Sequence, residues 1–274
     1  AQSAGSVIAV PKDSASPAGY SLYKRSDRNG TLVWEEKAPA SVARYAFDGV
    51  ETLDGKIYFV GGDGEGGACD IAERYDPASN QWETLNSMTT PREGVASSVL
   101  NGKLYAIGGI GLTSVEIFDP ATGLWSAGPN LPAEVRCGTA ITIDGKILLV
   151  GGSNASNQYL TQVLELDPAT NQWTHKTSMP TGRYGAKLVA LHGKLWVIGG
   201  QHTSPVSAVE AYDFSSNSWS AASPLTTPRA WCLAWVSNGK IHAAGGASIS
   251  SIEVYDFVTN QWSLSGNLSV TSYV

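Results

Sequence analysis

The sequence predicts an all-β fold, a closed ring of six four-stranded sheets known as a six-bladed β-propeller, and two repeating markers support this prediction. A Gly-Gly doublet ends five strand-like runs that each open with Gly-Lys, and the doublets begin at Gly61, Gly108, Gly151, Gly199 and Gly245. A tryptophan recurs at the same interval of 43 to 48 residues, at Trp34, Trp82, Trp125, Trp173, Trp219 and Trp262. Two markers with one period indicate that each repeat is one folded unit.

Each repeat is expected to form four short antiparallel strands. An inner strand such as 94–100 comes first, followed by the Gly-Gly strand, a strand that ends in Tyr-Asp or a similar pair, and the strand that carries the tryptophan. The last two are joined by a tight turn, as in YDPASNQW, where Asn or Gly tolerates the left-handed backbone conformation. These markers are therefore predicted to be structural. The full repeats cover about 44–82, 92–125, 136–173, 183–219 and 229–262.

The two ends of the chain predict how the ring closes. Residues 1–34 contain three strand-like segments, and the 12 residues after Trp262 contain one, so that together they make one repeat length. We expect residues 263–274 to pair with residues 1–34 in a composite sixth blade. This pairing would leave no open strand edge for aggregation.

Composition favours one domain over residues 1–274, because 42% apolar and 15% charged residues can form a large core. The chain contains no apolar run of about 18 residues, so no membrane span is expected. A formal charge of -6 argues against a nucleic-acid partner, which requires a basic face. The three cysteines and four histidines are widely dispersed, so we expect no metal site and no cofactor.

The combined pattern R-x-G, GKxYxxGG and VExYDPxxNxW resembles the kelch repeat of β-propellers over essentially the whole chain. The resemblance implies the propeller fold but no single activity. Proteins with kelch-like propellers include ubiquitin-ligase adaptors, actin-binding proteins, sialic-acid mutarotases, iron-dependent specifier proteins and copper oxidases.

An arginine stands just ahead of each inner strand, and by analogy with kelch repeats it lies near the mouth of the central channel. These candidate ligand-binding residues are Arg44, Arg92, Arg136, Arg183 and Arg229. Five convergent guanidinium groups would suit a carboxylate or a sulfate. In the alternative interpretation the arginines are neutralised internally by the glutamates that precede the aromatic residue of the third strand, namely Glu73, Glu116, Glu210 and Glu253.

Tyr184 and Trp231 complete the candidate surface, because they lie one and two residues after an arginine at positions that vary between repeats, and Trp231 stands where the other repeats have Ala or Gly. Trp231 is expected either to offer a stacking surface or to plug the channel. Cys137, next to Arg136, would have a lowered thiol pKa if it were exposed.

The leading hypothesis is a monomeric binding module that captures a protein, a peptide or an acidic carbohydrate at the channel mouth. The alternatives are a carbohydrate enzyme such as an acidic-sugar mutarotase, with Glu93 or Glu134 as general acid or base, and a structural or surface-adhesion domain. We expect no catalytic residue under the leading hypothesis. The first residues, Ala1-Gln2, lack a methionine, which fits either a processed secreted or periplasmic protein or a trimmed chain.

Overall fold

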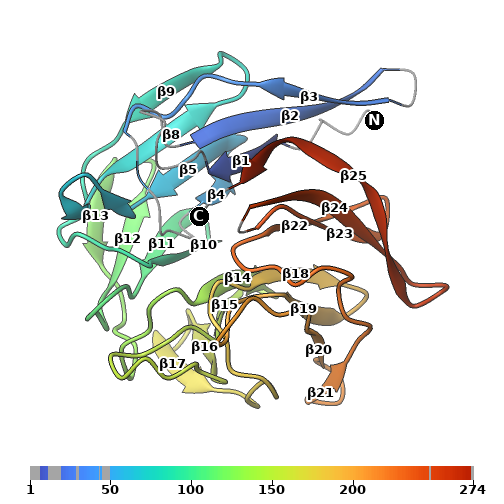
Figure 1. Ribbon diagram of the computed structural model, residues 1–274. Coiled ribbons are helices and arrows are strands. Elements are labelled where there is room, and N and C mark those ends of the chain that lie inside the picture. Colours follow the sequence, from blue (N-terminus) through green and yellow to red (C-terminus); the bar gives the residue numbers. More distant parts are fainter. Residues whose placement is uncertain are drawn as a thin grey trace.

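The computed structural model describes residues 7–11, 20–28, 31–42, 44, 50–246 and 248–272. In this part of the chain, five antiparallel sheets of four strands each follow one another around a ring (Figure 1). The innermost strand of each sheet faces the centre of the ring, and the tryptophan strand lies outermost. Each sheet is one blade, so the prediction of four strands per blade is correct.

The first blade comprises β4 (Val50–Leu53), β5 (Lys56–Val60), β8 (Ala72–Asp76) and β9 (Gln81–Thr84), with a small hairpin of β6 (Asp63–Gly64) and β7 (Gly67–Ala68). The second comprises β10 (Ala96–Leu100), β11 (Lys103–Ile107), β12 (Val115–Asp119) and β13 (Leu124–Ala127). The third comprises β14 (Thr139–Ile143), β15 (Lys146–Val150), β16 (Val163–Asp167) and β17 (Gln172–His175).

The fourth blade comprises β18 (Lys187–Leu191), β19 (Lys194–Ile198), β20 (Val209–Asp213) and β21 (Ser218–Ala221). The fifth comprises β22 (Leu233–Ser237), β23 (Lys240–Ala244), β24 (Ile249–Asp256) and β25 (Gln261–Ser272). The N-terminal strands β1 (Val7–Pro11), β2 (Tyr20–Arg28) and β3 (Thr31–Glu36) form a separate three-stranded sheet, which Figure 1 places between the first and the fifth blade.

The prediction of six blades, closed by a composite blade, is wrong. The C-terminal segment continues as β25, whose residue Ser272 pairs with Ile249 of β24, so it belongs to the fifth blade. The ladder has register shifts on both sides of Ser251, and such irregularities let a strand bend while it keeps its partner. Leu268, within the segment that was expected to pair with residues 1–34, packs instead with Ala244 and Ile252. Residues 273–274 lie outside the described residues.

The core lies between neighbouring blades. Tyr58, Phe59 and Tyr75 of the first blade, for example, pack with Leu104 and Phe118 of the second. Large aromatic and aliphatic residues on facing sheets bury the most apolar area, which is the main favourable contribution to folding. Within the described residues, no helix is long and apolar enough to cross a membrane.

The repeated tryptophan joins each blade to the preceding segment. The indole nitrogens of Trp82 and Trp125, for example, donate to the carbonyl oxygens of Ala38 (2.7 Å) and Asn86 (2.8 Å). Trp173, Trp219 and Trp262 make the matching bonds to Pro129, Thr177 and Ser223. The spacing of the tryptophans in the sequence therefore follows from one inter-blade contact made five times.

The turn before each tryptophan has the predicted left-handed residue. Its φ angle is 57° at Asn80 and 70° at Gly123, and it lies between 51° and 56° at Asn171, Asn217 and Asn260. The preceding aspartate accepts a hydrogen bond from an amide of its own turn, as Asp76 does from Ala78 at 2.8 Å. The Asp and Asn of the motif therefore shape the hairpin.

Candidate functional site

Four of the five repeat arginines are buried in ion pairs with the glutamates of the third strand. Arg92 lies 3.0 Å from Glu116, Arg183 lies 2.7 Å from Glu210, and Arg229 lies 2.9 Å from Glu253. Arg44 and Glu73 form the fourth pair. All eight side chains are at most 7% exposed. The glutamate pairing of the alternative interpretation is therefore present at these four arginines, whose side chains are buried.

The ion pairs also attach the segment that enters each inner strand. In the second blade, Glu116 accepts hydrogen bonds from the amides of Thr89 (2.7 Å) and Thr90 (3.1 Å) as well as from Arg92. Burial alone would raise the pKa of Glu116, but the bonds from Thr89 and Arg92 outweigh it and lower the pKa. The charged pair is therefore part of the architecture.

The third blade replaces this ion pair by two apolar residues. Val135 takes the position of the arginine. Its carbonyl accepts a hydrogen bond from the amide of Gly109 (3.0 Å), and in the preceding repeat the carbonyl of Arg92 accepts the equivalent bond from the amide of Gly62 (2.7 Å). Leu164 takes the position of the glutamate, and both residues belong to one buried cluster. Arg136 is therefore displaced by one residue. The sequence carries this signal, since Arg136 stands ten residues before the lysine of its Gly-Lys pair, whereas Arg92 stands eleven before its own.

Correct alignment defines a variable row of residues that follows the buried position. The row consists of Glu93, Arg136, Tyr184 and Ala230. Backbone hydrogen bonds set three members beside the residue that follows a Gly-Gly doublet: Ile110 donates to Glu93 (2.9 Å), Ser153 to Arg136 (2.9 Å) and Gln201 to Tyr184 (2.7 Å). We call this end of the ring, including Asp63 and the loops after the doublets, the Gly-Gly face.

In the second to fifth blades, the next residue forms part of a collar around the centre of the ring. The amide of Cys137 donates to Gly94 (2.7 Å), that of Gly185 to Cys137 (3.1 Å) and that of Trp231 to Gly185 (2.8 Å). All four residues have φ between 53° and 65°. A Cβ atom on Gly185 would lie 2.8 Å from the Trp231 ring, so the indole lies directly over this glycine.

Aromatic side chains gather beside the collar. The Tyr184 ring stacks on Tyr159 with centroids 5.8 Å apart and meets the edge of Trp231 at 5.7 Å. Tyr159 also contacts His202 at 4.4 Å. The loops that contain Tyr159 and His202 therefore lie on the same face as Tyr184. The individual side chains were missed, because these loops do not follow the repeat.

Arg136 is half-buried between this aromatic group and two carboxylates. Its Nε donates to the Ser153 hydroxyl (3.1 Å) and its Nη2 donates to the Asn157 side chain, whereas no described residue accepts from its Nη1. Burial and the nearby Asp63 raise the pKa of Glu93 above its ordinary value, although Arg136 acts in the opposite direction. On the Gly-Gly face, Glu93 and Asp63 thus provide acidic groups, Arg136 a basic group, and Tyr184 with Trp231 aromatic rings.

Cys137 does not meet the condition for a lowered thiol pKa, which was exposure of the side chain. Burial raises the pKa of its thiol to about 11, so the neutral thiol predominates at neutral pH despite the proximity of Arg136. Among the described residues, no group of three or more His, Cys, Asp and Glu side chains could hold a metal ion.

Comparison with known proteins identifies the repeats. The family model described as KLHDC2/KLHL20/DRC7 Kelch-repeats domain matches residues 112–269, and that described as Kelch motif matches residues 49–89 and 91–132. The solved structure of YjhT superposes with a TM-score of 0.75 over 90% of this chain and 91% of that one, at 17% identity, which shows a common fold.

Curated relatives share the repeats over part of their length. Kelch repeat and BTB domain-containing protein 13 of Homo sapiens is 40% identical over 102 residues, which is 34% of this chain and 22% of that protein. Alpha-scruin of Limulus polyphemus is 33% identical over 147 residues, 49% of this chain and 16% of that protein. Kelch-like protein 33 of Homo sapiens is 32% identical over 95 residues, 33% of this chain and 18% of that protein. The matched part therefore spans less than a quarter of these relatives.

Proposed function

The chain belongs to the kelch-repeat family, and on that premise we propose that its Gly-Gly face binds an anionic or polar ligand, either an acidic peptide or an acidic sugar. Arg136 carries the proposal. Of the five repeat arginines it is the one for which the described residues provide no glutamate partner, and it is more exposed than the other four. The proposed ligand-binding set is Arg136, Tyr184 and Trp231, and the four paired arginines support it from within the blades.

The surroundings of Arg136 favour recognition of an acidic group. Ser153 and Asn157 fix the guanidinium on one side, so a ligand carboxylate would meet a donor that is already oriented. Tyr184 and Trp231 lie on the side away from Glu93 and offer flat apolar area next to polar tips. An acidic peptide or sugar would place its carboxylate on Arg136 and an apolar face on the two rings.

Isothermal titration with two defined probes, a tetraglutamate peptide and N-acetylneuraminic acid, tests the proposal. We expect at least one probe to bind and Arg136→Gln to weaken it by about tenfold or more, because a hydrogen bond to a charged group contributes about 1.5–3 kcal/mol. Glu93→Gln should tighten binding, since it removes a negative charge that competes for Arg136. Arg74→Gln, which changes an arginine in the middle of β8 of the first blade, is the matched control. Binding that is unchanged in Arg136→Gln, or no binding of either probe, would refute the proposal.

A second candidate function rests on Glu93. A half-buried carboxyl with a raised pKa beside an arginine suits a general acid or base, as an acidic-sugar mutarotase requires. In that case the protein would accelerate the exchange of α- and β-N-acetylneuraminic acid followed by proton NMR. Glu93→Gln would abolish the acceleration while retaining binding. An exchange rate equal to that in buffer would eliminate this candidate and leave the binding module.

A further inference from the structure

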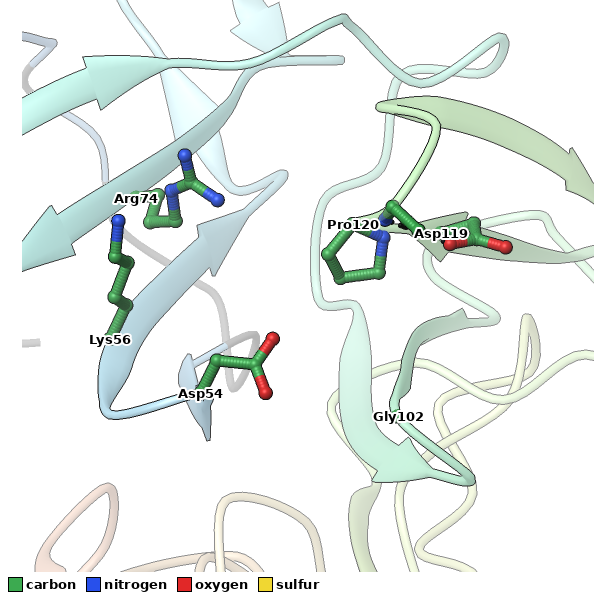
Figure 2. Close-up of a pocket in the computed structure, with 7 residues that line it drawn as sticks. Asp54, Lys56, Arg74, Gly102, Asp119 and Pro120 are labelled. Carbon is green, nitrogen blue, oxygen red and sulfur yellow. Dashed lines mark hydrogen bonds between the residues drawn. The ribbon is translucent and has the colours of Figure 1, made fainter.

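A pocket of about 340 Å³ lies between the first and second blades, at the end of the ring opposite the Gly-Gly face. The turn that contains Asp54 precedes β5 (Lys56–Val60) and the doublet at Gly61 follows it, so the turn and the doublet are at opposite ends of the blade. Figure 2 shows Asp54, Lys56 and Arg74 on one wall and Pro120 on the other. The pocket is separate from the proposed binding surface. Its volume is within the range of small-molecule sites.

The same slot between the fourth and fifth blades is filled by the chain itself. His192 there corresponds to Asp54, because both residues directly precede a Gly-Lys pair. Trp196 corresponds to Tyr58, because both stand two residues after the lysine of that pair. Phe257, which corresponds to Pro120, lies between them, with ring centroids 4.6 Å from His192 and 5.4 Å from Trp196. A slot of this kind therefore accepts a planar ring.

Arg74 distinguishes the open slot from the filled one. It pairs with Tyr58 across the ladder, and the corresponding residue in the fourth blade, opposite Trp196, is Ala211. The Arg74 guanidinium donates to the Tyr58 hydroxyl (3.2 Å) and to Glu83 (2.5 Å). These bonds use one donor on each terminal nitrogen and pair the charge of Arg74 with Glu83, so they hold the guanidinium plane in a fixed position where it can stack on a ring.

The two aspartates of the pocket differ in what they offer a ligand. Asp119 is engaged by Lys103 (2.9 Å) and by the amide of Ala121 (2.9 Å). Asp54 is exposed, and none of the described residues forms a hydrogen bond or an ion pair with its carboxylate. Figure 2 shows this carboxylate directed toward the gap between the blades, whereas that of Asp119 points away from it. Asp54 is therefore an acceptor directed at the slot.

We propose that this pocket binds a small, neutral, planar aromatic molecule that has an N–H or O–H donor at its edge. The ring occupies the place that Phe257 fills in the related slot, between the Arg74 guanidinium and Pro120. The edge donor bonds to the Asp54 carboxylate. A neutral ligand is preferred because Arg74 and Lys56 oppose a cation and Asp54 opposes an anion.

Phenol is the test probe, and three comparators each change one of its features. Toluene lacks the hydrogen-bond donor, cyclohexanol lacks the planar ring, and benzoate carries a negative charge. Amide shifts of Gly102 and Ala121, which line the pocket, report binding in proton–nitrogen NMR spectra. We expect phenol to bind with a dissociation constant of about 1 mM, a magnitude typical of so small a molecule. Each comparator should bind at least about fivefold more weakly.

Pro120→Phe should abolish the phenol-induced shifts, because it places in this slot the residue that fills the related one. Phenylalanine already stands at this turn position in the fourth and fifth blades, as Phe214 and Phe257, so the substitution should be tolerated. Pro168→Phe, at the same position of the third blade, is the matched control and should leave the shifts intact. Asp54→Asn should weaken phenol but not toluene.

The absence of phenol shifts at about 20 mM would overturn the proposal, since that concentration far exceeds the expected dissociation constant. Stronger binding of benzoate than of phenol would overturn it as well, because the site would then select an anion. Retention of the phenol shifts in Pro120→Phe would show that the probe binds outside the slot, which also contradicts the proposal.

Discussion

The apolar substitute in the third blade predicts how the buried ion pairs respond to mutation. In the second blade, Glu116→Leu removes the acceptor of the Arg92 guanidinium, whose side chain is 0% exposed. Arg92 keeps its bonds to the carbonyls of Gly108 and Ser114, both 2.8 Å long, but its charge is no longer neutralised. Loss of one partner of a buried pair costs about 3–5 kcal/mol of unfolding free energy.

The double substitution Arg92→Val with Glu116→Leu recreates the pair that the third blade already contains, Val135 and Leu164. No uncompensated charge then remains. The remaining cost is the loss of the partly buried bonds from Thr89 and Thr90 to Glu116, and of the bonds from Arg92 to the carbonyls of Gly108 and Ser114. We expect about 1–2 kcal/mol for the double variant. It should therefore be more stable than Glu116→Leu alone by about 2 kcal/mol, even though it carries one more change.

Thermal and urea unfolding of the wild type, both single variants and the double variant complete the cycle. Glu116→Leu should lower Tm by about 10 °C, and the double variant by less than half of that. Leu164→Glu in the third blade is the reverse control, and it should destabilise unless Val135→Arg accompanies it. The reasoning is refuted if the double variant loses as much unfolding free energy as the two single variants together, because the two side chains would then have no interaction energy.

Three further predictions concern the collar, the turns and the ring centre. Gly185→Ala should cost about 1–2 kcal/mol in urea unfolding, because its Cβ would meet the Trp231 ring and its φ is 59°; an unchanged midpoint would contradict this. Hydrogen bonds from Ser215 in the same turn lower the pKa of Asp213 to about 2. Lys240 and the amides of the Asp256 turn lower the pKa of Asp256 to about 2 as well. The stability that these two carboxylates add is present above their unfolded pKa of about 3.9 and is lost as the pH falls to about 2. The double variant Asp213→Asn with Asp256→Asn should therefore show a smaller decrease in Tm between about pH 4 and pH 2 than the wild type. Burial lowers the pKa of Lys187 to about 8, so between pH 8 and about 10.4 the unfolded state binds more protons and stability should rise with pH. Lys187→Met should remove this rise, and an identical Tm profile would contradict the assignment.

Local features of the blades could be predicted from the sequence. The Asp and Asn of the YDPASNQW turn specify a left-handed residue through short-range hydrogen bonds, and Asn80 has the expected conformation. The position of Trp82 was predictable because the same inter-blade contact repeats, which fixes its spacing. The burial of Arg92 was one of two alternatives, and the regular glutamate in the third strand was the signal for it.

Features that depend on a choice between distant partners could not be predicted. Residues 263–272 could pair either with the fifth blade or with the N-terminal sheet, and the length of this segment does not distinguish the two pairings. The choice depends on the bulged pairing around Ser251 and on the packing of Leu268, which have no local signature. The stacking of Tyr159 on Tyr184 likewise joins a non-repeated loop to another blade.

The central claim is that one repeat arginine serves recognition while four serve the architecture. Nε–Hε signals of the arginines test it most directly: their exchange is followed by NMR after transfer to deuterated water, and their peptide-induced shifts are recorded in ordinary water with and without tetraglutamate. We predict that the Arg136 signal exchanges fast and shifts with the peptide, while those of Arg92, Arg183 and Arg229 are protected and unshifted. Fast exchange of the three paired arginines, or peptide-induced shifts at them in place of Arg136, would contradict the account.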